Sequence, residues 1–382
     1  MGIRITPRKL RHIATYKVAH KLTTESAQAM QIAERISVEN RCRICNEPGD
    51  HEVFRVREMM FGTRDTFEYF QCKRCECLQI SEIPDNLSSY YPENYYSHQN
   101  ITTENKKWIL TSTLEKLLID TALFNKKYKL SSIARRFVSL PNYFFRARPT
   151  LLQRARINDY RARILDIGCG TQALWLQDLQ RVGFANLTGI DPFAKGNFSI
   201  GRIKILCMDA SELAHNTDHK FDLIALNHSL EHIPDQFGTL ASINRLLSPT
   251  GTCVIRIPTI SSISWKVYGV DWVELDAPRH LYIHSKKSIR ELARRAGLEL
   301  FDTQYDTTAF EFYGSEQYRL NIPLTSPESL WANRESTVFT REKQIEFAER
   351  AEKANADGTA GRACFFFRHA RPSDPSTDIE LF

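Results

Sequence analysis

The sequence contains no long uninterrupted run of apolar residues, although 42% of its 382 residues are apolar. A helix that crosses a membrane needs about 20 such residues in succession, so we expect no transmembrane segment. Lysine and arginine are scattered through residues 1–40. This stretch lacks an apolar signal core, which argues against secretion. Internal repeats and low-complexity tracts are absent as well. What remains is typical of an ordinary globular protein with roughly two or three folding units.

Cysteine is unevenly distributed along the chain. Five of the nine cysteines fall between Cys42 and Cys77, and the other four are scattered. A clustered set of odd number in a chain without a secretion signal points to metal binding and free thiols rather than to disulfides. We therefore expect a reducing, cytoplasmic compartment.

The clustered cysteines include two Cys-x-x-Cys pairs that are separated by 26 residues with two strand-like segments, Glu52–Val56 and Thr66–Phe70. Two such pairs on turns can place four thiolates at the corners of a tetrahedron, which suits a structural zinc ion. The alternatives are four unligated thiols or, less in keeping with two complete pairs, a redox site. Cys77 is either a bystander or a substitute ligand. The predicted zinc ligands are Cys42, Cys45, Cys72 and Cys75.

Positive charge is concentrated in one stretch. The chain carries a formal charge of +6, but residues 101–163 alone hold 14 Lys and Arg against 4 Asp and Glu, an excess of ten. Helical patterns run over Trp108–Leu123 and Tyr128–Leu140 within it. Its charges suit the phosphates of a nucleotide-linked sugar, an RNA backbone or an anionic membrane surface. A solvated helical face without a partner explains these charges as well. Nucleic acid is not the favoured partner.

From Ile164 onward, short apolar runs alternate with helical patterns. This alternation predicts an α/β fold with a mostly parallel, doubly wound sheet and helices on both faces. Ligands of such sheets bind beyond the carboxyl ends of the strands, and polar residues stand at those ends here: Asp166, Asp191, Asp209 and Asn227-His228. The predicted strands are Ile164–Ile167, Asn186–Ile190, Lys204–Cys207, Phe221–Leu226 and Thr252–Ile257.

Gly168 and Gly170 follow the first of these strands, in a turn that admits a ligand close to the backbone. A dinucleotide is one candidate, because Gly168-x-Gly170-x-x-Ala173 fits the dinucleotide fingerprint and Asp191 follows about 20 residues later. Asp166 argues against it, because a carboxylate would crowd a pyrophosphate but would accept a hydrogen bond from a ligand ammonium. Asp209 adds a carboxylate suited to an adenine amino group.

Seven segments together resemble the class I S-adenosylmethionine-dependent methyltransferases, in a subgroup that often carries an N-terminal zinc ribbon and modifies sugars. These segments are Ile164–Gly170, Gly189–Pro192, Met208–Ala210, Phe221–Ile224, Asn227–Asp235, Leu246–Thr252 and Asp276–Tyr282. The resemblance implies a Rossmann-like sheet whose last strand, Ala363–Phe367, is antiparallel.

The resemblance also assigns roles at the cofactor site. Asp191 would bind the ribose hydroxyls, Asp209 the adenine, and the two glycines would admit the methionine moiety. The family usually has a third glycine where this chain has Gln172, a departure that bears on turnover more than on fold. The predicted cofactor-binding residues are Asp166, Gly168, Cys169, Gly170, Asp191, Pro192, Asp209, Ala210, Asn227 and His228.

The segment His228-x-x-Glu231-His232 also fits the motif of inverted zinc peptidases. That chemistry requires both histidines on one helical face. Here the segment follows an apolar strand and precedes Pro234, so we expect a strand-end loop instead. Methyl transfer often needs a base for the acceptor proton, and the predicted catalytic residues are His232, Glu231 and His280.

Six regions follow from these patterns: a helical arm (1–40), the zinc ribbon (41–98), a basic helical linker (99–160), the methyltransferase domain (161–308 and 361–371), an acceptor-side insertion (309–360) and a tail (372–382). We expect methyl transfer to a small or carrier-linked acceptor, for example a sugar of a surface polysaccharide. RNA methylation and a catalytically silent scaffold that binds S-adenosylmethionine are the alternatives.

Overall fold

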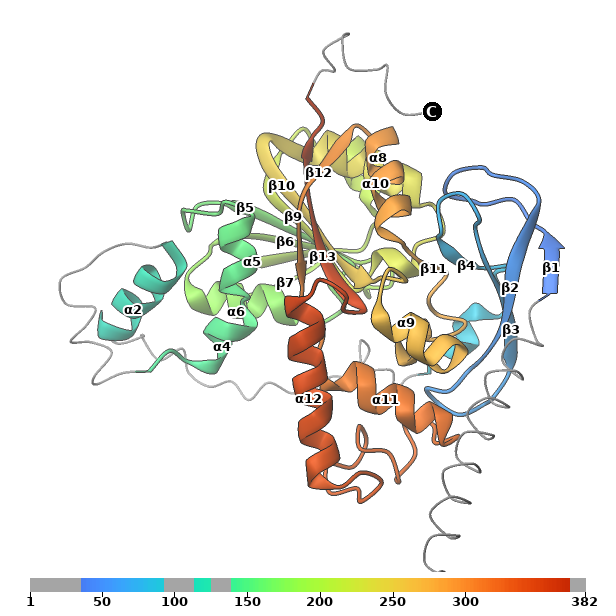
Figure 1. Ribbon diagram of the computed structural model, residues 1–382. Helices are drawn as coiled ribbons and strands as arrows, with labels where there is room; N and C mark the ends of the chain where they lie inside the picture. Colours follow the sequence, from blue (N-terminus) through green and yellow to red (C-terminus); the bar gives the residue numbers. More distant parts are fainter. Residues whose placement is uncertain (1–35, 93–112, 125–138, 372–382) are drawn as a thin grey trace, which may run out of the picture.

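The computed structural model describes residues 36–92, 113–124 and 139–371 (Figure 1). An eight-stranded sheet in the order β12-β13-β10-β9-β5-β6-β8-β7 organises most of them. Its five inner strands, from β10 to β8, are parallel, whereas β13 is antiparallel to both of its neighbours and β7 is antiparallel to β8. The predicted doubly wound sheet and its antiparallel last strand are therefore confirmed. The strands are β5 (Arg163–Ile167), β6 (Asn186–Ile190), β7 (Phe198–Ile200), β8 (Ile203–Leu206), β9 (Phe221–Asn227), β10 (Leu247–Pro258), β12 (Leu298–Tyr305) and β13 (Arg362–His369).

Side chains alternate between the two faces of each strand, and both faces of this sheet are covered. Ile164, Leu223 and Val254 face one layer of helices, while Leu165 and Ile224 face the other. The first layer contains α4 (Asn142–Arg146), α5 (Pro149–Arg154) and α6 (Leu174–Val182), with α2 (Thr113–Phe124) packed outside it. The second layer contains α7 (Ala210–Asn216), α8 (Gln236–Leu246) and α10 (Lys286–Arg295).

The insertion before the last strand contributes helices of its own. α11 (Ala309–Arg319) and α12 (Arg341–Ala356) pack on each other beside the large sheet (Figure 1). α12 begins after Thr340, whose side chain accepts a hydrogen bond from the Lys343 amide, and it buries Phe347, Ala351 and Ala354 along one face. The remaining helical turns are α9 (Ile263–Tyr268), η1 (Leu87–Tyr90), η2 (Leu230–His232), η3 (Gly269–Asp271) and η4 (Val273–Leu275).

The cysteine-rich segment forms a second, five-stranded antiparallel sheet in the order β1-β2-β3-β4-β11. Its first four strands are β1 (Ile36–Glu39), β2 (Asp50–Arg57), β3 (Thr66–Gln71) and β4 (Leu78–Ile80). The fifth strand, β11 (Tyr282–Ile283), comes from the C-terminal half of the chain and lies beside β4 in Figure 1. One sheet is thus shared by segments about 200 residues apart in sequence.

A buried ion network reinforces this junction. Arg279 and Glu58 both have no exposed side-chain surface, and their Nη2 and Oε1 atoms are 2.8 Å apart. Asp276 accepts further hydrogen bonds from the same guanidinium, and Arg279 Nη1 donates to the Tyr90 carbonyl. The Tyr69 hydroxyl donates to the main-chain oxygen of His280 at 2.8 Å. The cysteine-rich sheet is therefore bound to the loop that carries His280.

Most expected elements are found within two or three residues of their predicted bounds, but some differ. Ile36–Glu39, expected in a helical arm, form a strand instead, and residues 1–35 lie outside the described residues. Of the two predicted helices of the basic stretch, the first appears as α2, and most of the second lies outside the described residues. None of the helices within the described residues has the length and apolarity that a membrane span requires.

Replacing Arg279 by Ala should lower the free energy of unfolding by about 3–5 kcal/mol, because Glu58 and Asp276 would keep buried charges without their partner. Urea unfolding followed by circular dichroism measures the change. Arg290→Ala on the exposed face of α10 is the matched control and should cost less than about 0.5 kcal/mol. Equal costs for the two variants would contradict the structural role of the network.

Candidate active site and cysteine cluster

The loop after β5 runs so close to its neighbours that glycine is required. Gly168 and Gly170 have φ angles of 73° and 66°, which non-glycine residues seldom adopt. A Cβ on Gly168 would lie 2.5 Å from Cβ of Ser229. Gly189 in β6 faces this loop from the other side, and a Cβ there would lie 2.5 Å from Sγ of Cys169. The loop leads directly into α6, and the half-buried Gln172 lies within it.

Asp191 at the end of β6 is oriented by two main-chain hydrogen bonds. Its Oδ2 accepts from the Gly170 amide and its Oδ1 from the Phe193 amide, both at 2.9 Å. Each carboxylate oxygen has a further lone pair. Pro192, next in sequence, is exposed. The carboxylate is therefore fixed beside the glycine loop and can still accept hydrogen bonds from a ligand hydroxyl.

Asp166 and Asn227 form a buried polar pair at the ends of β5 and β9. Asn227 Nδ2 donates to Asp166 Oδ1 at 3.3 Å, and Asp166 is 3% exposed. Burial raises the pKa of the Asp166 carboxyl to about 7. Asn227 Oδ1 is buried and has no hydrogen-bond partner among the described residues. A buried acceptor beside a destabilised carboxylate favours a cationic donor such as an α-ammonium group.

Asp209, at the start of α7, has a structural role that the sequence alone did not reveal. Its side chain accepts a hydrogen bond from the Glu212 amide, and the Glu212 carboxylate accepts from the Asp209 amide, which forms a capping box. Ala210 is the buried first residue of the helix. Asp209 itself is exposed at the same edge of the sheet as Asp191.

His228 follows β9 directly, and Glu231 and His232 lie on the 3-10 turn η2 just after it, as expected for a strand-end loop. His228 has a left-handed φ of 53°, and its Nδ1 lies 3.2 Å from Oε1 of the fully buried Glu231. His280 approaches the same carboxyl group from the loop after η4, with 4.0 Å between Nε2 and Oε1. The structure thus brings the three predicted catalytic side chains together.

Hydrogen bonds to carbonyl groups fix the tautomers of two histidines. His280 Nδ1 donates to the Glu274 carbonyl at 2.8 Å, and His232 Nδ1 donates to the Arg279 carbonyl at 2.9 Å. Both Nε2 atoms therefore keep a lone pair that can bind a proton or a metal. One ligand atom from each of Glu231, His232 and His280 lies within 4.8 Å of the others.

Burial sets the protonation of this cluster. It lowers the pKa of His232 to about 3 and raises that of Glu231 well above its usual range. Burial also lowers the pKa of His280, but the Asp276 carboxylate 3.9 Å from its Nε2 counteracts the shift. Burial thus favours the neutral form of both imidazoles and of Glu231, and His280 has the nearer stabilising carboxylate for an imidazolium.

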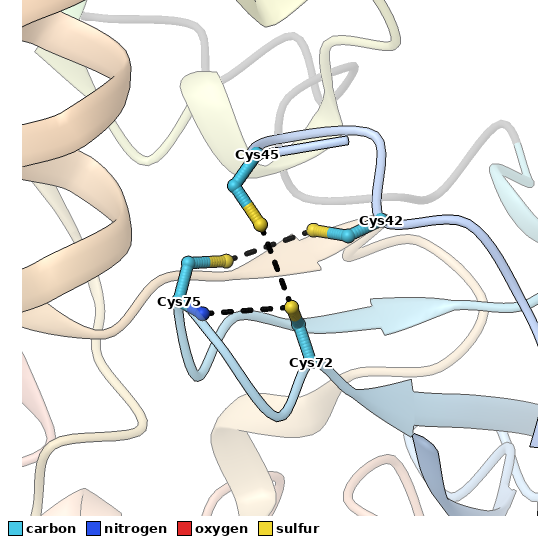
Figure 2. Close-up of side chains that lie close together, drawn as sticks. All are labelled: Cys42, Cys45, Cys72 and Cys75. Atoms are coloured by element: carbon cyan, nitrogen blue, oxygen red, sulfur yellow. Dashed lines mark hydrogen bonds between the residues drawn. The ribbon is translucent and has the colours of Figure 1, made fainter. Parts of the chain in front are cut away.

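The four predicted zinc ligands converge in the cysteine-rich sheet (Figure 2). Cys42 and Cys75 are 3.6 Å apart at their sulfur atoms, as are Cys45 and Cys72. Tetrahedral zinc with Zn–S bonds of about 2.3 Å separates its sulfurs by about 3.8 Å, so the donor set fits zinc. Cys77 lies outside this group, with its thiol directed at the Leu78 carbonyl. All nine cysteines are free.

Comparison with known proteins finds similarity in the central part of the chain. Residues 139–303 match the family model described as a methyltransferase domain. The ubiquinone biosynthesis O-methyltransferase of Neisseria meningitidis is 25% identical over 160 residues, which cover 37% of this chain and 66% of that protein. The protein of the same name from Aeromonas salmonicida is 31% identical over 137 residues, covering 32% of this chain and 56% of the relative. This chain thus spans about two thirds or less of these relatives.

Solved structures with a similar chain path are more distant. A methyltransferase from Archaeoglobus fulgidus is 17% identical, with a TM-score of 0.35 and coverage of 63% of this chain and 99% of that chain. A Burkholderia thailandensis N-methyltransferase with bound S-adenosylhomocysteine is 18% identical, with a TM-score of 0.34 and coverage of 59% and 79%.

The family match and the named relatives agree on the central part of the chain. Residues 139–303 form a methyltransferase domain.

Replacing Gly168 by Ala should destabilise the protein by about 2–4 kcal/mol, because left-handed strain adds to a clash with Ser229. Gly196→Ala isolates the strain, since Gly196 has a φ of 88° and no atom within 4 Å of the added Cβ. We expect this control to lose only about 1–2 kcal/mol in urea unfolding. Indistinguishable losses would show that the loop does not press against Ser229.

Proposed function

We propose that the chain transfers a methyl group from S-adenosylmethionine to a small or carrier-linked acceptor. The observation that carries this proposal is the junction at Asn227-His228. Asn227 closes the polar pair with Asp166 beside the glycine loop, and His228 contacts Glu231 of the histidine cluster. A cofactor site and a group of proton-accepting side chains are therefore adjacent on one edge of the sheet.

The residues present fit this cofactor. Asp191 would accept hydrogen bonds from the ribose hydroxyls, and Asp209 would accept one from the adenine amino group. Asp166 and the unpartnered Asn227 Oδ1 would bind the α-ammonium group, with Gly168 and Gly170 giving access. When bound, the cofactor supplies an electrophilic methyl group on its sulfonium.

We infer that His280 is the base that removes the acceptor proton. Its Nδ1 proton is held by the Glu274 carbonyl, so Nε2 is free to accept, and Asp276 lies where it would stabilise the resulting imidazolium. His232 contacts the His280 ring edge-to-face, with 4.7 Å between ring centroids, and its lower pKa makes it a weaker base. Glu231 is the third member of this group.

Two acceptor classes are consistent with proton removal by His280. The resemblance of the Asp276–Tyr282 segment favours a sugar of a surface polysaccharide. The names of the relatives favour an intermediate of quinone biosynthesis, since two of them are ubiquinone biosynthesis O-methyltransferases. We propose the sugar as the first acceptor to test, with label transfer from S-adenosylmethionine into polysaccharide and quinone fractions as the readout.

Nucleic acid as the acceptor is less well supported. Within the described part of the basic stretch, arginines pair with carboxylates of the methyltransferase domain, among them Arg146 with Asp178 and Arg154 with Asp302. These charges stabilise packing and are less available to phosphates. Methylation of RNA that is abolished by replacing the Lys and Arg of residues 101–163 would instead favour that alternative.

Replacing Asp191 by Ala should weaken binding of S-adenosylhomocysteine at least about tenfold, because charge-assisted hydrogen bonds are lost. His280→Ala should leave this affinity within about twofold and lower the rate of label transfer about 100-fold or more. Because burial lowers the pKa of His280, the acid limb of the wild-type rate should lie below pH 6.5. Calorimetry and a radiolabel assay measure these changes.

His215→Ala, at an exposed histidine on α7, is the matched control and should change neither affinity nor rate. If His232→Ala weakened cofactor binding more than Asp191→Ala, the assignment of the site would be wrong. Cofactor binding without transfer to any cell extract would identify a silent scaffold, with Gln172 as the first suspect position.

We also propose that the four clustered cysteines hold a structural zinc ion. The tetrahedral spacing of their sulfurs supports it, as does the side-chain amide of Gln79, which donates to Cys42 Sγ at 3.1 Å. Ligand-directed N–H donors of this kind stabilise thiolate charge. Bound zinc would hold the two Cys-x-x-Cys turns of the ribbon together.

Cys72→Ser should reduce bound zinc from about one ion per chain to well below half, as measured by mass spectrometry of the purified protein. It should also lower the melting temperature. Cys77→Ser, at an equally buried neighbour outside the tetrahedron, should retain the metal. Zinc loss in both variants, or in neither, would contradict the assigned ligand set.

A further inference from the structure

A pocket of about 460 Å³ opens at the carboxyl edge of the large sheet, between α4, the start of α6 and the ends of β10, β12 and β13. It belongs to neither the cofactor residues nor the histidine cluster described above. Four arginines and two aspartates line it, together with apolar surface from Phe145, Leu174 and Trp175.

The charges in this pocket do not balance. Arg146 is neutralised by Asp178 through two hydrogen bonds of 2.8 Å. The other three guanidinium groups converge on a single carboxylate, that of Asp306. Its oxygens lie 2.6 Å from Arg256 Nε, 3.2 Å from Arg148 Nη1 and 3.2 Å from Arg362 Nε. The lining therefore carries an excess of two positive charges.

Burial makes this excess costly. The side chains of Arg256 and Arg362 are only 8% and 12% exposed. Burial, with the nearby Arg362 and Arg148, lowers the pKa of Arg256 to about 10. A further carboxylate, that of Glu274, is 4.0 Å from Arg362, and burial raises its pKa to about 7, which disfavours its charged form. Buried like charges of this kind favour an anionic ligand.

The backbone also holds one of these arginines in an unfavourable conformation. Arg148 has a left-handed φ of 56° immediately before Pro149, a combination that costs on the order of 1 kcal/mol or more. In this conformation its guanidinium reaches Asp306 across the pocket. Such strain persists only where surrounding contacts impose it, and it positions a third cation at the same point.

The pocket adjoins the proposed site of transfer. Arg256 is the β-ladder partner of Asn227, and its carbonyl accepts a hydrogen bond from the His228 amide at 2.9 Å. An anionic group that contacts Arg256 would therefore lie only one strand away from Asn227 and His228. Phe145 and Trp175 offer flat apolar surface to the part of the ligand beside that group.

We propose that Arg148, Arg256 and Arg362 bind a phosphate or diphosphate group of the methyl acceptor. This inference rests on the proposed methyl transfer and narrows its acceptor to a phosphate-bearing small molecule. Guanidinium groups bind phosphate oxygens through paired hydrogen bonds, and a dianion matches the excess of two charges. The other oxyanion with access to this edge is the carboxylate of the cofactor, which carries one negative charge.

The test measures the affinity of wild type for inorganic pyrophosphate and, separately, for S-adenosylhomocysteine by calorimetry at constant ionic strength. Arg148→Gln removes the most exposed of the three guanidiniums and should weaken pyrophosphate binding at least about tenfold. It should leave the affinity for S-adenosylhomocysteine within twofold. Arg362→Gln should act in the same direction. Arg161→Gln, at a side chain that is 89% exposed, is the matched control.

Absence of pyrophosphate binding by wild type, or equal binding by Arg148→Gln, would overturn the inference. A loss of affinity for S-adenosylhomocysteine alone would assign the arginines to the cofactor carboxylate and would overturn it as well. Failure of wild type to bind S-adenosylhomocysteine would instead refute the proposed function. Melting temperatures of the variants show whether each remains folded.

Discussion

The geometry of the candidate active site depends on the ion pairs of the buried Arg279 guanidinium. Its partners are Glu58 from the cysteine-rich sheet and Asp276 from the loop after η4. The next residue in sequence is His280, whose main-chain oxygen is held by Tyr69 of that same sheet. Because Asp276 also faces the His280 ring, one ion network both joins the two sheets and sets the electrostatic surroundings of the proposed base.

The edge of the large sheet combines three environments of different charge. Asp166 and Asn227 offer acceptors to a cation, burial favours the neutral forms in the histidine cluster, and the arginines around Asp306 favour an anion. These environments lie close together, because Asn227 of β9 and Arg256 of β10 are paired in the sheet. A sulfonium cofactor and a phosphate-bearing acceptor would each meet the charge that complements it. The order of the strands would thus orient the two proposed substrates relative to each other.

Local patterns in the sequence predict much of this structure. Apolar runs that end in Asp166, Asp191 and Asn227 predict strands and their polar ends, because strand period and burial are local properties. The Cys-x-x-Cys spacing predicts the four thiols that converge. The pairing of β11 with β4 and the grouping of Arg148, Arg256 and Arg362 around Asp306 have no local signal, since tertiary packing brings these residues together from separate elements. The capping role of Asp209 was likewise not predicted, because the family resemblance assigned this residue to adenine binding.

The strand β11 also determines whether the two sheets can be produced as separate polypeptides. It closes the cysteine-rich sheet, although it lies more than 200 residues beyond that segment's last cysteine. A shortened polypeptide that began after residue 100 would expose the hydrogen-bonding edge of β11 and would bury Arg279 without Glu58. Such a fragment would be prone to aggregate during expression. The small sheet therefore belongs to the same cooperative folding unit as the large one, and structural or enzymatic work on the methyltransferase domain requires both.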